Sequence, residues 1–198
     1  MEKFKKYVLG LILFFICFNG FPQQNDKNPI LYAEFYFGGA LGYINGIILG
    51  GELNSQLNKT LFTLRYSGVV DVERQYFLGI PFLAETGSID EFSLLLGQRY
   101  IQEGYSTSFS LGPSYNITEI YNAETGNMDR TDSFGLSLEA NIKLFKNEKE
   151  KYRILYIIPV GEPTGFGRSI GLKLSGNISK TSYLGLSIIS GLGWHKIY

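Results

Sequence analysis

Residues 133–145 read SFGLSLEANIKLF. Their side chains alternate between two kinds. The apolar set is Phe134, Leu136, Leu138, Ala140, Ile142 and Leu144, and the small or polar set is Gly135, Ser137, Glu139, Asn141 and Lys143. A period of two residues is typical of a β-strand whose faces lie in different environments. The stretch is long enough to cross a membrane as a tilted strand, which takes ~9–11 residues. We therefore predict a strand with one face toward lipid and the other toward a polar interior.

The same alternation recurs beyond the N-terminal segment, whereas apolar residues do not recur at helical spacing. The other strands that this pattern predicts lie at roughly 31–42, 45–55, 59–70, 91–101, 105–117, 165–178 and 182–197. Because proline cannot donate a backbone hydrogen bond, Pro113 predicts a bulge or a strand end. The resulting eight strands predict an all-β fold, an antiparallel up-and-down transmembrane β-barrel.

The connections between these strands differ in length. The turns at 56–58 and 102–104 are short, whereas 72–89 and 118–131 are long and polar. Outer-membrane barrels have short periplasmic turns and longer outer loops, which fits this order if the first strand begins on the periplasmic side. The long segment 146–164 does not fit, because 152–158 resembles a strand. It extends a neighbouring strand, pairs outside the barrel, or raises the count to ten. We retain eight, since both chain ends are then periplasmic.

The N-terminal residues predict export. Lys3, Lys5 and Lys6 precede an apolar run at 7–18, which has the length of the central region of a signal peptide and is short of the ~20 residues of a spanning helix. We predict a signal peptide at 1–22 and a barrel domain at 23–198, with an uncleaved anchor as the alternative. Cys17 is the only cysteine and leaves with the leader, so the mature chain has no thiol or disulfide.

Composition supports this class of protein. The chain contains 24 Gly, 14 Tyr and 15 Phe with only 18% charged residues, a profile typical of twisted strands and aromatic membrane interfaces. Loss of Glu2, Lys3, Lys5 and Lys6 from a chain of formal net charge zero leaves a mature net charge of about −2. No basic excess remains for nucleic acid.

A soluble periplasmic β-sandwich also alternates apolar and polar residues. The second face of the predicted strands argues against a sandwich, because it consists of Gly, Ser, Asn and single charges rather than the Lys, Glu and Thr of a solvated sheet. Such a face is typical of a narrow barrel interior.

The Gly-rich inner face and a last strand that ends Trp194-His195-Lys196-Ile197-Tyr198 resemble the outer-membrane β-barrel superfamily. Lys196 departs from the pattern, which usually has a hydrophobic residue there. The resemblance implies the outer membrane of a Gram-negative cell, contact with its lipid, and recognition by the barrel-assembly machinery during biogenesis. The segment 176–185 resembles the last hairpin of uncharacterised small barrels, a family that implies no known activity.

The predicted interior carries charges from several strands, namely Glu34, Glu52, Arg65, Arg99, Glu139, Lys143 and Lys173. Isolated buried charges are costly, so we predict an internal salt-bridge network. An eight-stranded barrel is only wide enough for its own side chains, which favours a filled interior over the alternative of an ion-conducting lumen.

Catalytic chemistry finds no support in the sequence. Outer-membrane lipid A deacylases use a His and a Ser close together on one strand, but Ser187 and Ser190 lie several residues from His195, the only histidine. We predict no catalytic residue, no metal site and no cofactor.

The predicted role is therefore that of a non-enzymatic outer-membrane protein with a structural or interaction function, exerted through outer loops 72–90 and 118–131 on an extracellular partner that the sequence does not identify. The first alternative is a narrow channel for small solutes, and the second is a lipid-modifying enzyme.

Overall fold

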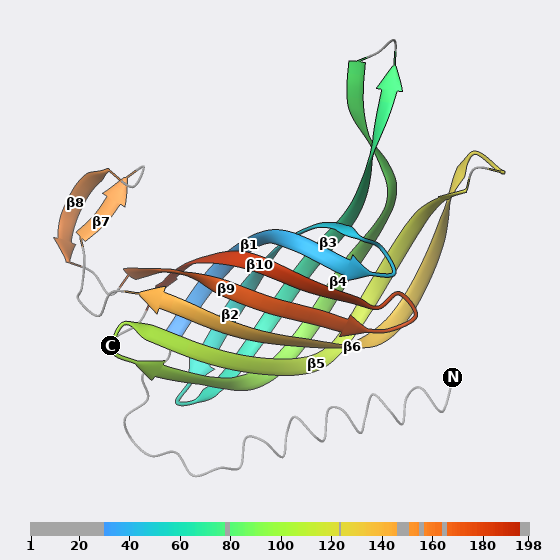
Figure 1. Cartoon of the computed structure of the whole chain (residues 1–198). Helices are drawn as coiled ribbons and strands as arrows, with labels where there is room; N and C mark the ends of the chain where they lie inside the picture. The colour runs from blue at the N-terminus through green and yellow to red at the C-terminus, as the bar shows by residue number, and fades with distance from the viewer. Residues whose placement is uncertain are drawn as a thin grey trace, which may run out of the picture.

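The computed structural model describes residues 30–77, 80–122, 124–145, 151–154, 157–163 and 166–194. Within these residues, eight strands form a closed barrel in the order β1-β10-β9-β6-β5-β4-β3-β2, with every neighbouring pair antiparallel (Figure 1). The barrel strands are β1 (Ile30–Gly42), β2 (Gly46–Leu57), β3 (Thr60–Phe77), β4 (Ile80–Gln102), β5 (Tyr105–Asn122), β6 (Asn127–Phe145), β9 (Phe166–Ile178) and β10 (Tyr183–Trp194). The predicted all-β, up-and-down fold of eight strands is confirmed.

The predicted signal peptide at 1–22 lies outside the described residues and stays a prediction. Among the residues described, no helix has the length and apolar character needed to span a membrane.

Alternating burial in the strands follows the alternating sequence. In β6, Ser137, Glu139 and Lys143 are buried, whereas Phe134 is 80% exposed and Leu144 is 59% exposed on the outside. An outward apolar face and an inward polar face are the reverse of a soluble protein. Large hydrophobic residues are exposed on every barrel strand, which gives the band that a lipid bilayer would cover.

The barrel closes where β1 pairs with β10, from Leu31 opposite Trp194 to Gly42 opposite Tyr183. This seam requires a small residue at one position: a Cβ added to Gly38 would lie 2.0 Å from the carbonyl oxygen of Leu186. The glycine-rich inner face therefore lets neighbouring strands approach closely.

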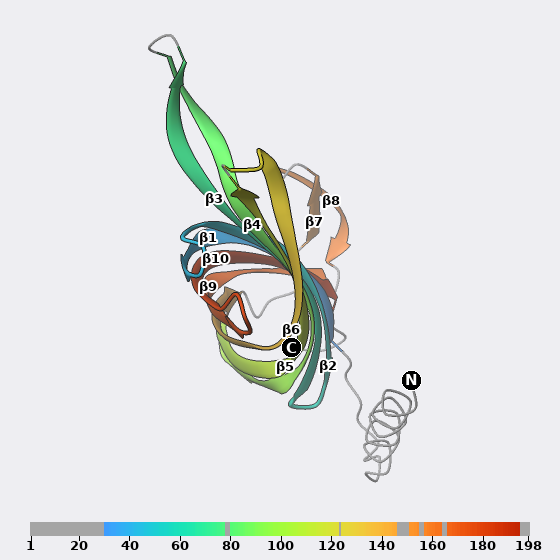
Figure 2. The ribbon, with the colours of Figure 1, turned by 90° about the vertical axis from the view of Figure 1, so that its right-hand side faces the viewer.

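The predicted long outer loops at 72–90 and 118–131 are wrong as loops, because strand pairing continues through them. β3 and β4 pair as far as Phe77 opposite Ile80, and β5 and β6 pair as far as Asn122 opposite Asn127. Both hairpins extend well past the other barrel strands (Figure 2). Beyond a membrane both faces of a strand are in water, so these residues need no apolar alternation. The sequence signal for a strand is lost while the backbone hydrogen bonds persist.

Two short strands lie within the segment 146–164, of which the structure describes residues 151–154 and 157–163. β7 (Lys151–Ile154) pairs with β8 (Ile158–Pro163) in a two-stranded sheet separate from the barrel. It follows β6 at the end of the barrel where β1 begins and β10 ends, called the inner end below (Figure 1). Pairing outside the barrel was one of the predicted alternatives and is confirmed, and a barrel of ten strands is wrong.

Pro113 produces neither the bulge nor the strand end that we predicted. β5 continues to Asn122, and β4 and β5 keep the same register before and after the proline. Pairing is interrupted only between Ser93–Ser114 and Leu96–Leu111, where proline has no N–H to donate. On the other side of β5, the pairing with β6 is continuous, and Pro113 lies opposite Leu136.

Candidate functional site

The structure places all seven predicted charged residues inside the barrel. They come from β1, β2, β3, β4, β6 and β9, and each is at most 7% exposed. These residues are Glu34, Glu52, Arg65, Arg99, Glu139, Lys143 and Lys173. Six of them are joined by ion pairs, and Arg99 lies apart.

An eighth interior charge, Glu91 of β4, was missed by the sequence reasoning. It is fully buried and lies at the centre of a dense set of hydrogen bonds. It accepts from Arg65 at 2.6 Å, from Asn177 at 2.7 Å and from the Tyr183 hydroxyl at 2.8 Å. The alternation does place it on the face of Ser93 and Arg99, but we began the strand at this residue and assigned 72–90 to a loop. Extending the period by one step would have included Glu91.

The outer part of the network is built around two cations that each bridge two carboxylates. The Arg65 guanidinium contacts Glu91 at 2.6 Å and Glu139 at 3.0 Å. The Lys173 ammonium contacts Glu139 at 2.7 Å and also pairs with Glu52. A guanidinium suits this bridging role because its planar fork of N–H donors reaches two carboxylates at once. These contacts join β4, β3, β6, β9 and β2 across the lumen.

The inner part of the network continues from Glu52 through an amide. The Asn54 side chain donates to Glu52 and to Glu34, each at 3.1 Å. Lys143 then pairs with Glu34 at 2.6 Å, and its ammonium lies 4.7 Å from the centroid of the Tyr32 ring. The result is one continuous row of polar contacts that spans six strands. Such a row exists only when the barrel is closed.

Arg99 is the exception among the buried bases. Its guanidinium donates to Ser106 at 3.1 and 3.2 Å and to Gln56 at 3.4 Å, and it stacks on Tyr32 at 4.6 Å. Within the described part of the chain it contacts no carboxylate.

Apolar side chains fill the lumen above the row, at the outer end. Ile44, in the β1–β2 turn, is only 5% exposed, and its Cδ1 atom would lie 3.2 Å from a Cβ added to Gly87 of β4. The buried cluster to which it belongs comprises Tyr36, Ala40, Ile44, Ile48, Val69, Ile89, Tyr183 and Ile189. Because the turn folds inward, this apolar layer covers the charged row from the outer side.

Two of the residues weighed for catalysis are separated by the barrel wall. Ser187 is buried in the lumen, whereas Ser190 is exposed on the outer face of β10. His195 lies outside the described residues. Among the residues that are described, no group of His, Cys, Asp and Glu is arranged to hold a metal ion.

Comparison with known proteins identifies the fold. No family model matches the chain, and no curated protein matches it in sequence. The N-terminal β-barrel domain of Pseudomonas aeruginosa OprF superposes with a TM-score of 0.52 at 12% identity, covering 85% of this chain and 100% of that one.

Two further solved structures have similar statistics. The attachment invasion locus protein Ail of Yersinia pestis, in complex with the heparin analogue sucrose octasulfate, has a TM-score of 0.52 at 11% identity, covering 86% and 99%. Neisserial surface protein A has a TM-score of 0.48 at 11% identity, covering 84% and 96%. This chain therefore has the fold of the small eight-stranded outer-membrane β-barrels.

Proposed function

We propose that the chain is a non-enzymatic outer-membrane protein with a closed, non-conducting barrel, and that it acts as a structural or interaction protein through its outer hairpins. The observation that carries the proposal is the burial of the interior charges. All eight, Glu91 included, are between 0% and 7% exposed. In a water-filled pore, solvent would reach these side chains.

The energetics of the interior favour the same proposal over a channel. Conduction needs sites that bind ions weakly enough to release them. Here the buried carboxylates are bound by Arg65, Lys143 and Lys173, and the apolar cluster around Ile44 covers the row. An ion that entered would have to break buried ion pairs, which is strongly unfavourable. Because the buried acids and bases hold one another, they serve the barrel rather than a reaction.

The outer hairpins supply the surface on which a partner would be met. Their acidic residues are Asp71, Glu73, Glu85, Asp90, Glu119, Glu124, Asp129 and Asp132, against the bases Arg74 and Arg130, and Lys180 lies in the β9–β10 turn at the same end. Ail was solved with a sulfated heparin analogue. The acidic surface proposed here would repel such a polyanion and favours a partner with basic groups.

Two hydrogen bonds stabilise the negative charge of Asp132 on this surface. The Tyr115 hydroxyl donates to its carboxylate at 2.7 Å, and Arg130 Nε donates at 3.1 Å. The hydrogen bond from Tyr115 and then that from Arg130 lower the pKa of Asp132 below its usual value. The carboxylate therefore stays ionised in mildly acidic as well as neutral medium.

Planar-bilayer recording tests the closed barrel. We expect the wild-type protein to give no stable single-channel steps. The control for insertion is heat-modifiable gel migration of protein from the same membrane preparation. Stable steps from inserted wild-type protein, with a size that changes in Arg65→Ala, would support the channel and contradict the proposal.

A further inference from the structure

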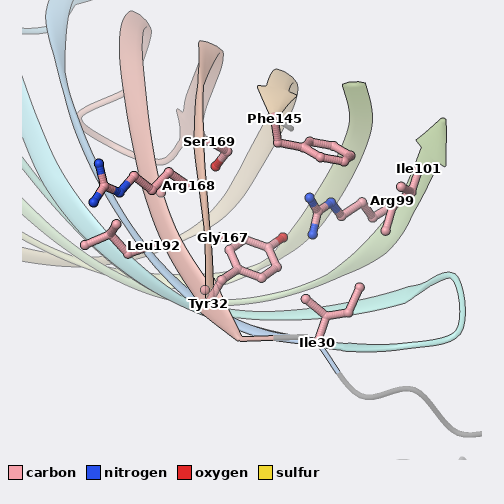
Figure 3. A pocket seen from close by; sticks show the side chains of 11 residues that line it. Ile30, Tyr32, Arg99, Ile101, Phe145, Gly167, Arg168, Ser169 and Leu192 are labelled. Atoms are coloured by element: carbon pink, nitrogen blue, oxygen red, sulfur yellow. The ribbon is translucent and has the colours of Figure 1, made fainter. Parts of the chain in front are cut away.

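The inner end of the barrel contains a pocket with a volume of about 40 Å³ (Figure 3). Its lining includes the side chains of Tyr32, Arg99 and Ser169 together with Gly191 and Gly193, whereas the Arg168 side chain extends away from Tyr32 and Arg99 (Figure 3). One water molecule needs ~10–15 Å³ of such space. The pocket is therefore large enough for a few waters or for one small polyatomic ion.

A buried hydroxyl in this pocket lacks a partner. Tyr32 is 7% exposed, and its hydroxyl oxygen forms no hydrogen bond with the described residues. Buried polar groups are nearly always hydrogen-bonded, because leaving one unsatisfied costs its lost hydration. The Tyr32 hydroxyl and the Arg99 side chain extend toward one another in the pocket (Figure 3). A ligand beside the two groups, in contact with both, would satisfy the hydroxyl.

Arg99 has donors to spare for such a ligand. Its described hydrogen bonds go only to neutral groups, two to Ser106 and one to Gln56. A guanidinium carries more N–H donors than these three bonds use. The other buried bases of the lumen, Arg65, Lys143 and Lys173, all contact carboxylates. Arg99 thus differs from them in lacking an anion within the described chain.

The sign of the local charge indicates the class of ligand. Arg99 Cζ lies 4.6 Å from the centroid of the Tyr32 ring, and Lys143 Nζ lies 4.7 Å from the same centroid. The nearby Glu34 carboxylate is bound by Lys143 at 2.6 Å. Both cations therefore lie against the Tyr32 ring. Of the two, Arg99 is the one that contacts no carboxylate of the described chain, and its charge favours a negatively charged group beside it.

We propose that this pocket binds one small oxyanion, a phosphate or carboxylate group, through the Arg99 guanidinium and the Tyr32 hydroxyl. Arginine is well suited to such groups because its planar donors match their paired oxygens. The same chemistry is offered by a free anion in the periplasm and by the headgroup of a phospholipid in the inner leaflet. The pocket lies at the inner end of the barrel, at the opposite end from the outer hairpins.

Solution NMR of the refolded full-length protein in a non-ionic detergent tests the proposal. Inorganic phosphate is titrated at constant ionic strength, and the amide signals of Gly167, Gly191 and Gly193 report on the pocket lining. We expect saturable shifts confined to these signals and their neighbours. Arg99→Gln should weaken the apparent affinity by at least about tenfold, since it removes a charge-assisted hydrogen bond. Lys59→Gln is the matched control, because Lys59 is an exposed cation in the β2–β3 turn at the same end.

A second titration with dihexanoyl phosphatidylglycerol, below its critical micelle concentration, separates the two sources. Saturation at lower concentration than with phosphate identifies a lipid headgroup, and saturation by phosphate alone identifies a free anion.

If neither probe shifts the signals, or if Arg99→Gln binds as tightly as wild type, the proposal is overturned. Should Arg99→Gln fail to fold, Tyr32→Phe decides instead, because it removes only the orphan hydroxyl. A severalfold loss of affinity supports the site, and unchanged affinity overturns it.

Discussion

Replacing Arg65 with alanine should lower the free energy of unfolding by about 3–5 kcal/mol, the cost typical of breaking a buried ion pair. Arg65 lies between Glu91 at 2.6 Å and Glu139 at 3.0 Å, and all three side chains are fully buried. Without the guanidinium, two carboxylates remain in the lumen with fewer positive charges to stabilise them. Urea unfolding in lipid vesicles, followed by the fluorescence of Trp194, measures the change.

The control for this prediction is Arg130→Ala. Arg130 pairs with Asp132 at 3.1 Å, but both side chains are about half exposed. Removing a solvent-exposed pair changes stability by only ~0–1 kcal/mol. If Arg65→Ala is no more destabilising than Arg130→Ala, water reaches the lumen well enough to solvate the charges, and the filled interior is wrong.

The second large effect is expected on the outer face of the barrel. Ile188 lies near the middle of β10, is 62% exposed, and faces outward from the ring. Arginine at this position should destabilise the protein in vesicles by about 2–4 kcal/mol, because a charge at the bilayer midplane loses its hydration. The same unfolding assay gives the value.

Leu57→Arg provides the comparison at the membrane edge. Leu57 is also exposed, but it is the last residue of β2 and lies at the turn to β3. Near the interface the same substitution should cost only ~0–1 kcal/mol. Equal effects at Ile188 and Leu57 would mean that no bilayer covers the apolar band.

The fold could be predicted from the sequence wherever the two faces of a strand meet different solvents. In β6, apolar residues that face lipid alternate with small or polar residues that face the lumen, from Phe134 to Leu144. The contrast disappears above the membrane, which is why the continuation of β3 to Phe77 and of β6 from Asn127 was not foreseen. Burial, and not strand formation, is what the alternation encodes.

For the candidate site, the sequence predicts which charges face inward but not which charges pair with one another. Alternation identifies which charges face inward, since that depends on position along one strand. It does not identify partners, because those depend on the stagger between strands far apart in the sequence. Lys143 and Glu34 meet across the lumen although 109 residues separate them. Arg99 shared the same inward pattern, and nothing in the sequence indicated that it would lie in a pocket instead of an ion pair.

The strands close into a barrel through the pairing of β1 with β10. Phe37 and Ile188 lie opposite one another in that pairing, and both face outward. The only native cysteine, Cys17, falls in the predicted leader, so a cysteine pair introduced here would be the only one in residues 23–198.

The measurement is disulfide formation in vesicles by Phe37→Cys/Ile188→Cys, compared with Phe37→Cys/Leu184→Cys. Leu184 is four residues before Ile188 in β10, opposite Leu41, which places it roughly 13 Å from the paired position and beyond the reach of a disulfide. We expect the first pair to oxidise and to keep the protein compact on heating in detergent, and the second pair to stay reduced. Failure of the first pair to oxidise in folded protein, or equal oxidation of both, would contradict the closed barrel.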